Sequence, residues 1–253
     1  MDLSSLAFSF RSHLWLGDQL SSVDHSSLST GFSELDNELP GGGWPTAALT
    51  EVLPQYEGIG ELRLLAPVLS TLSKEGRQLI FVAPPYVPYA PSLQAAGVDL
   101  SQLSVVRTRS PREMLWTTEQ ALRSNACGAV VAWTMHIDYK ELRRLQLAAE
   151  GGSALAVLFR PAYAIRENSP AALRLKLQTF KNNLEVHVLK RRGGVLSKPV
   201  LLKTTPTCFH ASRVDSEQTS VTEQGRKVKH HVVDRSSFSE FTDRIVSRDY
   251  SFV

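Results

Sequence analysis

The sequence of 253 residues has few cysteines and no long apolar run. Its cysteines, Cys127 and Cys208, lie far apart, which gives neither a disulfide framework nor the paired spacing of a zinc site. No stretch reaches the roughly 18 apolar residues of a membrane-spanning helix. The N-terminus is serine-rich without an apolar core, which is not typical of a secretory signal. These absences predict a cytoplasmic protein that does not contact membranes.

The composition is that of a globular protein, with 42% hydrophobic and 21% charged residues, but its charge is unevenly distributed. The formal net charge is +3. Residues 1–159 hold 11 Lys/Arg and 16 Asp/Glu, residues 160–213 hold 11 and 2, and residues 214–253 hold 6 and 7. Positive charge concentrated in one segment is typical of a protein with a polyanionic partner.

Short apolar strands alternate with capped helices through the middle of the chain. Helix N-termini are predicted at Ser110, before Pro111, and at Asp138, which has Glu141 three residues later. This alternation predicts right-handed crossovers and an α/β fold, with a doubly wound, mostly parallel sheet flanked by helices. The predicted strands cover residues 49–53, 79–83, 103–107, 129–133 and 154–159.

A β-hairpin is predicted after the last of these strands. Apolar and polar residues alternate over 173–178 and 184–188, on either side of a turn at 181–183. One face of this C-terminal antiparallel hairpin is apolar and the other largely basic. Its cations could bind nucleic-acid phosphates through salt-dependent contacts, or could form a charged face that protects an edge strand. The candidate phosphate-binding residues are Arg174, Lys176, Lys190, Arg191, Arg192 and Lys198.

Three parts are predicted along the chain. Residues 1–28 form an N-terminal helical segment, and residues 29–210 form the main domain, with the basic hairpin region at 171–203. Residues 211–253 are a polar tail with too few large apolar residues to fold, so this tail is predicted to be disordered. Near its end, Phe238 and Phe241 have helical spacing, which favours a short helix that binds a partner or docks on its own domain.

The segment 29–36 (STGFSELD), followed by 39–45 (LPGGGWP), resembles the approach to the ATP site of RecA-type recombinases. Residues 96–103 (AGVDLSQL) also resemble the RecA pattern. The resemblance implies a RecA-like domain in which a strand at 49–53 leads to a phosphate loop at 54–62.

The residues that ATP hydrolysis requires are missing from this pattern. A working loop needs a lysine against the phosphates and a hydroxyl that binds Mg²⁺. Trp133 stands where the metal-binding carboxylate is expected, and Pro85 lies in the region expected to hold the general base. We therefore predict a non-enzymatic protein with a degenerate nucleotide site and no cofactor. The matching slot holds Gly58, Gly60, Glu61 and Leu62.

Other catalytic or metal-binding patterns are also missing. The pairs Cys208/His210 and His230/His231 have no second cluster that would complete four ligands, so no metal site is predicted. No nucleophile elbow appears in the sequence.

Four motifs in order resemble the ImuA family, RecA-like accessory proteins of bacterial mutagenesis cassettes. They are 40–45 (PGGGWP), 58–62 (GIGEL), 83–91 (APPYVPYAP) and 189–194 (LKRRGG). The resemblance implies an accessory subunit of damage-induced translesion DNA synthesis in the SOS response. Its implied partners are a Y-family polymerase-like protein and an error-prone replicative-type polymerase, with RecA and single-stranded DNA as further candidates.

Tyr86 and Tyr89 lie in the third motif, whose prolines suggest either an aromatic partner-binding patch or a rigid loop that closes the sheet edge. With Phe238 and Phe241, they are the candidate partner-binding residues.

An alternative is the SulA family of cell-division inhibitors, which is also RecA-like without an intact phosphate loop. SulA proteins are shorter and bind FtsZ. The basic hairpin and the polar tail favour the ImuA interpretation over this alternative.

Overall fold

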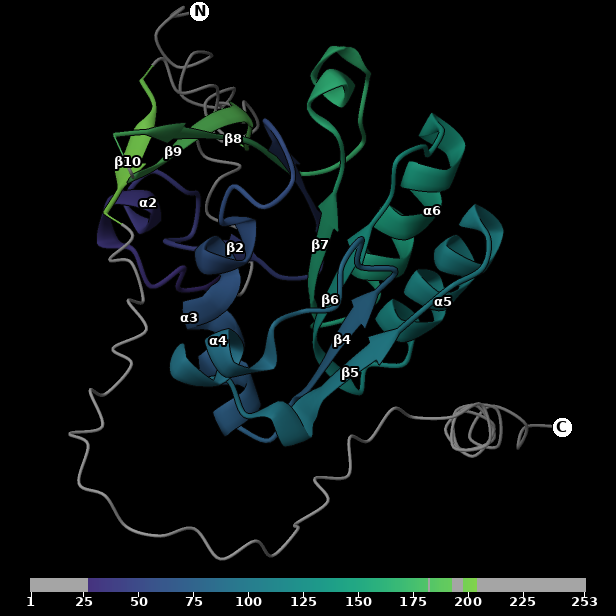
Figure 1. Cartoon of the computed structure of the whole chain (residues 1–253). Helices are drawn as coiled ribbons and strands as arrows, with labels where there is room; N and C mark the ends of the chain where they lie inside the picture. Colours follow the sequence, from purple (N-terminus) through teal and green to yellow (C-terminus); the bar gives the residue numbers. More distant parts are fainter. Residues whose placement is uncertain (1–26, 182, 193–197, 204–253) are drawn as a thin grey trace, which may run out of the picture. The chain divides into compact units, whose positions relative to one another are not determined.

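The computed structural model describes residues 27–181, 183–192 and 198–203 (Figure 1). The predicted tail, including Phe238 and Phe241, lies outside these residues, as does the N-terminal segment up to residue 26. Ser27 and Leu28, the last two residues of the predicted N-terminal segment 1–28, form a strand, so a helical segment does not extend to residue 28. No helix in the described ranges is long and apolar enough to span a bilayer.

An eight-stranded mixed sheet organises the chain (Figure 1). Its strand order is β10-β9-β8-β3-β7-β6-β4-β5, and a separate two-stranded sheet pairs β1 with β2. The strands are β1 (Ser27–Leu28), β2 (Trp44–Pro45), β3 (Leu49–Pro54), β4 (Gln78–Val82), β5 (Leu103–Val106), β6 (Cys127–Trp133), β7 (Leu155–Phe159), β8 (Leu173–Phe180), β9 (Asn183–Lys190) and β10 (Val200–Leu202). The helices are α2 (Ser33–Asp36), α3 (Glu61–Lys74), α4 (Ala90–Ala95), α5 (Pro111–Arg123) and α6 (Tyr139–Glu150), with 3₁₀ turns η2 (Leu100–Gln102) and η3 (Ala162–Arg166).

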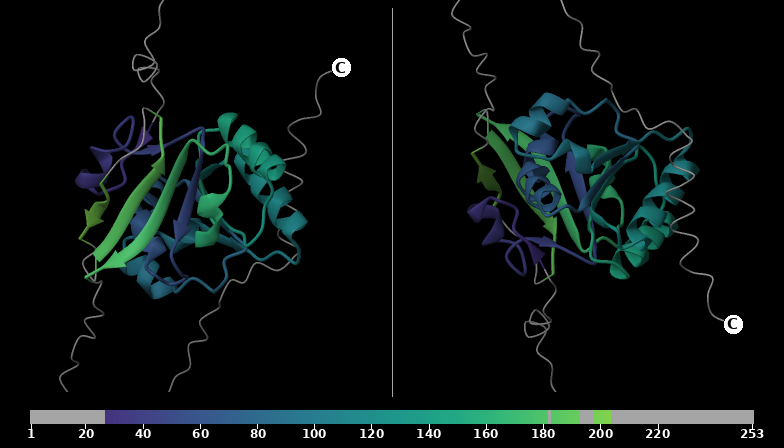
Figure 2. Two further views of the ribbon diagram at one scale, coloured as in Figure 1. Left: turned by 90° about the horizontal axis from the view of Figure 1, so that it is seen from above. Right: turned by 90° about the horizontal axis from the view of Figure 1, so that it is seen from below.

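The strands from β8 to β5 pair in parallel, whereas β8, β9 and β10 pair antiparallel. Helices α3 and α4 cover one face of the sheet, and α5 and α6 lie side by side on the other (Figure 2). The chain is therefore an α/β protein with a mixed sheet. The RecA-like assignment remains a prediction.

The two predicted helix caps form, with one difference in detail. The Asp138 carboxylate accepts from the Glu141 amide at 2.7 Å, and Glu141 accepts in return from the Asp138 amide at 2.9 Å. Ser110 accepts from the Glu113 amide at 3.2 Å, but the Glu113 carboxylate accepts from the amide of Arg109, one residue before the cap. Each helix therefore begins where the sequence predicts.

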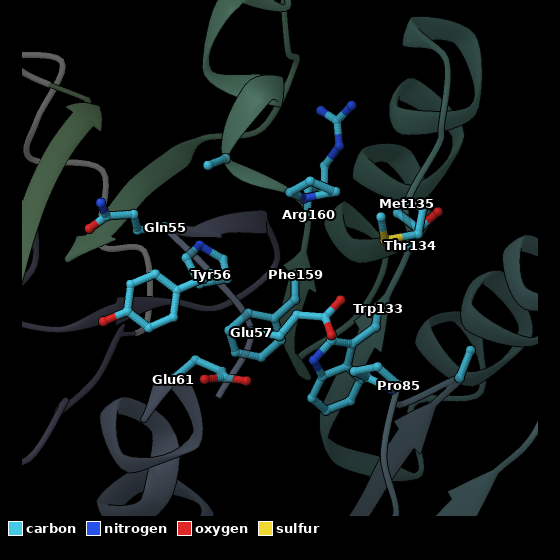
Figure 3. Close-up of a pocket in the computed structure, with 14 residues that line it drawn as sticks. Gln55, Tyr56, Glu57, Glu61, Pro85, Trp133, Thr134, Met135, Phe159 and Arg160 are labelled. Atoms are coloured by element: carbon cyan, nitrogen blue, oxygen red, sulfur yellow. The ribbon is translucent and has the colours of Figure 1, made fainter. Parts of the chain in front are cut away.

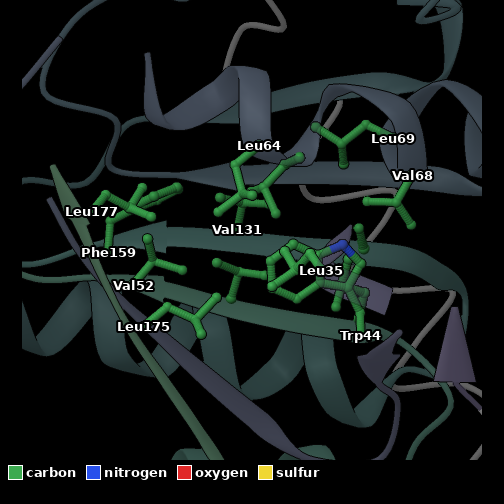
Figure 4. Close-up of a cluster of buried hydrophobic side chains, with 14 of the residues drawn as sticks. Leu35, Trp44, Val52, Leu64, Val68, Leu69, Val131, Phe159, Leu175 and Leu177 are labelled. Atoms are coloured by element: carbon green, nitrogen blue, oxygen red, sulfur yellow. The ribbon is translucent and has the colours of Figure 1, made fainter. Parts of the chain in front are cut away.

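The motif at 29–36 has a structural role. The Asp36 carboxylate accepts from the Ser29 hydroxyl at 2.7 Å and from the Thr30 amide at 2.8 Å, which closes the turn before α2. Gly31 has a φ of 81°, and a Cβ there would lie 2.3 Å from the Pro67 Cβ in α3. The motif thus fits this segment closely against α3. Beside it, Leu35 and Trp44 are fully buried in the core on the α3 side (Figure 4).

A buried ion-pair network links β3 to arginines from its two neighbours in the sheet: Arg160 follows β7, and Arg174 lies on β8. Glu51, on β3, is completely buried. Arg160 Nη1 donates to its Oε1 at 2.9 Å, and Arg174 Nε donates to its Oε2 at 2.6 Å. Arg160 also pairs with Glu167. Because buried charges are costly unless paired, removal of one member would leave an uncompensated charge in the interior.

Candidate functional site

A pocket of about 250 Å³ lies where the carboxyl ends of β3, β4, β6 and β7 meet (Figure 3). In α/β sheets this edge is where ligands and partners usually bind, because the loops that leave the strands converge there. The floor and walls are largely apolar. The lining residues are Pro54, Gln55, Tyr56, Glu57, Glu61, Ala83, Pro85, Trp133, Thr134, Met135, Phe159, Arg160, Pro161 and Ala162.

The predicted phosphate-loop slot is occupied by its own glutamate. The Glu61 carboxylate accepts from the Gly60 amide at 3.1 Å and from the Gly58 amide at 3.3 Å. Gly60, with a φ of 101°, is the N-cap of α3. In a phosphate loop such amides hold a bound anion. Here a side chain of the same chain takes their hydrogen bonds and adds a negative charge that repels phosphate.

Trp133 closes the floor of the pocket. Its ring stacks on Phe159 with centroids 5.1 Å apart and meets Phe81 edge-on at 5.4 Å. The position assigned to a metal-binding carboxylate is therefore part of an aromatic cluster. Among the described residues, no group of three His, Cys, Asp or Glu side chains could hold a metal ion. Cys208, His210, His230 and His231 lie outside those residues.

Large side chains are exposed around the pocket on the loops that follow the strands. We call them the carboxyl rim: Tyr56, Tyr86, Val87, Tyr89, Met135 and Tyr163, with exposed fractions between 49% and 71%. Protein interfaces are enriched in Tyr, Trp and Met, and exposed apolar patches mark interaction surfaces. The rim has the composition of a protein-binding surface.

Hydrogen bonds hold parts of the rim in place. The Tyr86 hydroxyl bonds to the Glu57 carboxylate, and this bond, with the negative charge of Glu57, raises the pKa of Tyr86. Tyr163 donates to the Met135 carbonyl oxygen. The predicted residues Tyr86 and Tyr89 both lie on this surface. The sequence analysis did not predict that Tyr56, Met135 and Tyr163 bind a partner. Each follows a strand by a few residues, where polar residues are usual, and an apolar or aromatic residue at such a position was the available signal.

The prediction that Arg174 binds phosphate disagrees with the structure. Its guanidinium is buried and donates to Glu51, to the Ala164 carbonyl at 2.8 Å and to the Glu167 carbonyl at 3.1 Å. Period-two alternation assigned it to the basic face of the hairpin, but at this end of β8 that face is covered by η3. Arg174 is therefore not available to a phosphate.

The other cations of the hairpin differ in exposure. Lys190 is exposed but donates to the Ser169 carbonyl oxygen at 2.9 Å, and partial burial, followed by the charge of Arg174, lowers its pKa. Arg191 donates to the Glu38 carbonyl oxygen. Lys176 is half-buried, while Arg192 and Lys198 are exposed on either side of residues 193–197. Lys190, Arg192 and Lys198 are thus the most accessible of the predicted set.

Sequence comparisons find similarity to known proteins in the region from β3 to the start of β7. Residues 50–156 match the model of the family described as cell division inhibitor SulA. This region of the chain is similar to SulA. The SulA of Edwardsiella piscicida is 30% identical over 98 residues, which are 39% of this chain and 58% of the relative. The SulA of Yersinia pestis (strain Pestoides F) is 26% identical over 118 residues, 47% of this chain and 70% of the relative.

The extent of this similarity matters for the site. The chain matches less than two thirds of the first relative's length. The matched residues include Glu61, Trp133 and the rim residues up to Met135, but not the hairpin. These matches support the resemblance to SulA, whereas the resemblance to ImuA stays a prediction.

Replacing Glu61 with alanine is expected to lower the free energy of unfolding by about 1–2 kcal/mol, because two loop amides lose their acceptor and the helix N-terminus loses a negative charge. Urea denaturation measures the change. Glu75→Ala is the matched control at the other end of α3, where a carboxylate faces carbonyl groups, and it should not destabilise the protein. Equal effects of both variants would contradict the role assigned to Glu61.

Proposed function

We propose that this chain is a non-enzymatic binding protein that inhibits cell division as its SulA relatives are named for doing, by binding FtsZ. The observation that carries the proposal is that the SulA-similar residues 50–156 contain both the self-occupied slot and most of the carboxyl rim. A SulA-like role in the SOS response follows from the same similarity.

The geometry of the edge favours binding over catalysis. A phosphoryl-transfer site needs positive charge and a metal ligand where this chain has Glu61 and Trp133. The exposed tyrosines and Met135 instead offer large, adaptable apolar contacts at the point where a cofactor would otherwise bind. We therefore propose a RecA-like domain in which the edge that would bind a nucleotide instead binds a partner protein.

Induced expression in a rod-shaped bacterium tests this proposal. We expect cells to grow into filaments without septa, and fluorescently labelled FtsZ to lose its rings, while DNA replication continues. Normal division at a level where the full chain is soluble would contradict the proposal.

A second candidate function is an accessory role in translesion DNA synthesis beside polymerase-like partners. The observation that favours it is the basic segment at 160–213, which lies outside the SulA-similar residues. The chain is also longer than its relative, since 98 aligned residues are 39% of this chain but 58% of the Edwardsiella protein. The four motifs that resemble ImuA support the same candidate.

For this second candidate, the triple variant Lys190/Arg192/Lys198→Ala is expected to bind single-stranded DNA more weakly. The negative slope of log affinity against log salt should become shallower by about 2. Fluorescence anisotropy across a salt series measures both. Arg63, Lys140 and Arg143 are exposed cations elsewhere, and their triple alanine variant is the matched control. Identical slopes for the two triple variants would contradict DNA contact by the hairpin region.

A further inference from the structure

Two carboxylates on one side of the pocket, those of Glu57 and Glu61, form no ion pair within the described residues. Arg160 lines it, but its guanidinium is engaged by Glu51 and Glu167 and points away from Trp133 (Figure 3). Glu51 also pairs with Arg174, so the two carboxylates and two guanidinium groups of this network have no net charge. Glu57 and Glu61 remain, and neither forms an ion pair within the described part of the chain.

The Glu57 carboxylate differs from that of Glu61 in its accessibility. Glu61 is held by the loop amides, whereas Glu57 is exposed at the mouth of the pocket and bonded to the Tyr86 hydroxyl. In Figure 3 the Glu57 carboxylate points toward Trp133. A group that enters the pocket would therefore meet an aromatic floor and a negative charge together.

The size of the pocket favours a single side chain. Its volume of about 250 Å³ is below the roughly 300–1,000 Å³ of sites for drug-sized ligands and cofactors. Interface hot spots are enriched in aromatic side chains and arginine, which fill such pockets and are surrounded by contacts that exclude water. The exposed rim residues Tyr56 and Met135 line the pocket and can form that surround, and Tyr163 donates a hydrogen bond to the Met135 carbonyl oxygen.

We infer that the pocket receives one aromatic or large aliphatic side chain of a partner protein, with a Lys or Arg of the same segment paired to Glu57. This inference rests on the proposed protein-binding function and specifies the chemistry of the partner. The apolar floor selects the anchor, and the Glu57 carboxylate selects its basic neighbour. Phosphate-bearing ligands are disfavoured by the two carboxylates.

Selection of a random dodecapeptide phage library on the full chain tests the inference, followed by fluorescence polarisation with synthetic peptides. We expect the selected peptides to share an aromatic or aliphatic residue next to Lys or Arg. Glu57→Lys should weaken them about tenfold, and the same peptides with Glu in place of Lys or Arg should recover binding to that variant. Selected peptides without basic residues, or no selected peptides, would overturn the inference.

A second variant tests the pocket itself. Ala162→Trp places a bulky ring in the lining and should abolish peptide binding, whereas Leu147→Trp, on the exposed face of α6, should not. Thermal melts confirm that both variants fold. Peptide binding that is unaffected by Ala162→Trp would overturn the inference. Displacement of the selected peptides by a peptide of residues 236–248 would also overturn it, since the occupant would then be the chain's own tail. Peptide binding without filamentation would instead count against the division proposal alone.

Discussion

The variant Glu51→Ala is expected to lose about 3–5 kcal/mol of unfolding free energy, the largest effect of any substitution proposed for this chain. The reason is that two buried guanidinium groups, of Arg160 and Arg174, would lose their shared carboxylate at once. Breaking a buried pair leaves an uncompensated charge in a low-dielectric interior, which costs more than the pair contributes.

Urea denaturation of the full chain measures this loss. Glu167→Ala is the matched control, because its carboxylate also pairs with Arg160 but is 44% exposed, and exposed pairs typically contribute about 0–1 kcal/mol. We also expect Glu51→Gln to be milder than Glu51→Ala, since the amide can still accept one hydrogen bond. A loss below about 1 kcal/mol for Glu51→Ala would contradict the network as described.

The double variant Tyr86→Ala/Met135→Ala is expected to raise the concentration needed to inhibit FtsZ assembly by at least about 30-fold, as loss of two hot-spot contacts would. Both side chains are exposed, so stability should change by no more than about 0.5 kcal/mol. The double variant Trp116→Ala/Leu147→Ala removes similarly exposed apolar groups from α5 and α6 and should leave inhibition unchanged.

Equal potency of the wild type and the rim variant would contradict the role of the carboxyl rim. Equal loss in both double variants would show that the effect is general to exposed apolar residues. A loss confined to the rim variant is the result that the proposed interface requires.

Much of the architecture could be predicted from local sequence signals. The Asp138 cap and the short apolar strands are local features, and the helices and parallel strands follow from them. Leu175 and Leu177 alternate with polar residues, and their side of β8 is buried as that pattern predicts. These features depend on neighbours within a few residues, which a sequence displays directly.

Arg174 shows where alternation misleads. A charged residue in an otherwise apolar parallel strand, Glu51, needs a buried partner, and this requirement was the available signal that a basic residue nearby is structural. Which arginine it pairs with depends on strand order, because β3 and β8 are adjacent although more than a hundred residues apart in the chain. Sequence alone does not supply that order.

The carboxyl rim could be predicted only in part for a similar reason. Tyr86 lies in a conspicuous proline-rich motif, but Tyr56 and Tyr163 come from isolated turns. They converge with Tyr86 only because parallel strands bring their carboxyl ends to one edge. The sequence shows only that Glu61 stands where a phosphate-binding lysine is expected. The structure shows in addition that the Glu61 carboxylate accepts hydrogen bonds from the loop amides that would otherwise bind a phosphate.

The most direct test of the proposed function is light scattering of purified FtsZ assembling with GTP in the presence of the full chain and without ATP. The proposal predicts that assembly falls as the chain approaches the concentration of FtsZ, and that added Mg-ATP changes nothing. Unimpaired FtsZ assembly at a large molar excess of the chain would contradict it, and inhibition that requires ATP would contradict the degenerate nucleotide site.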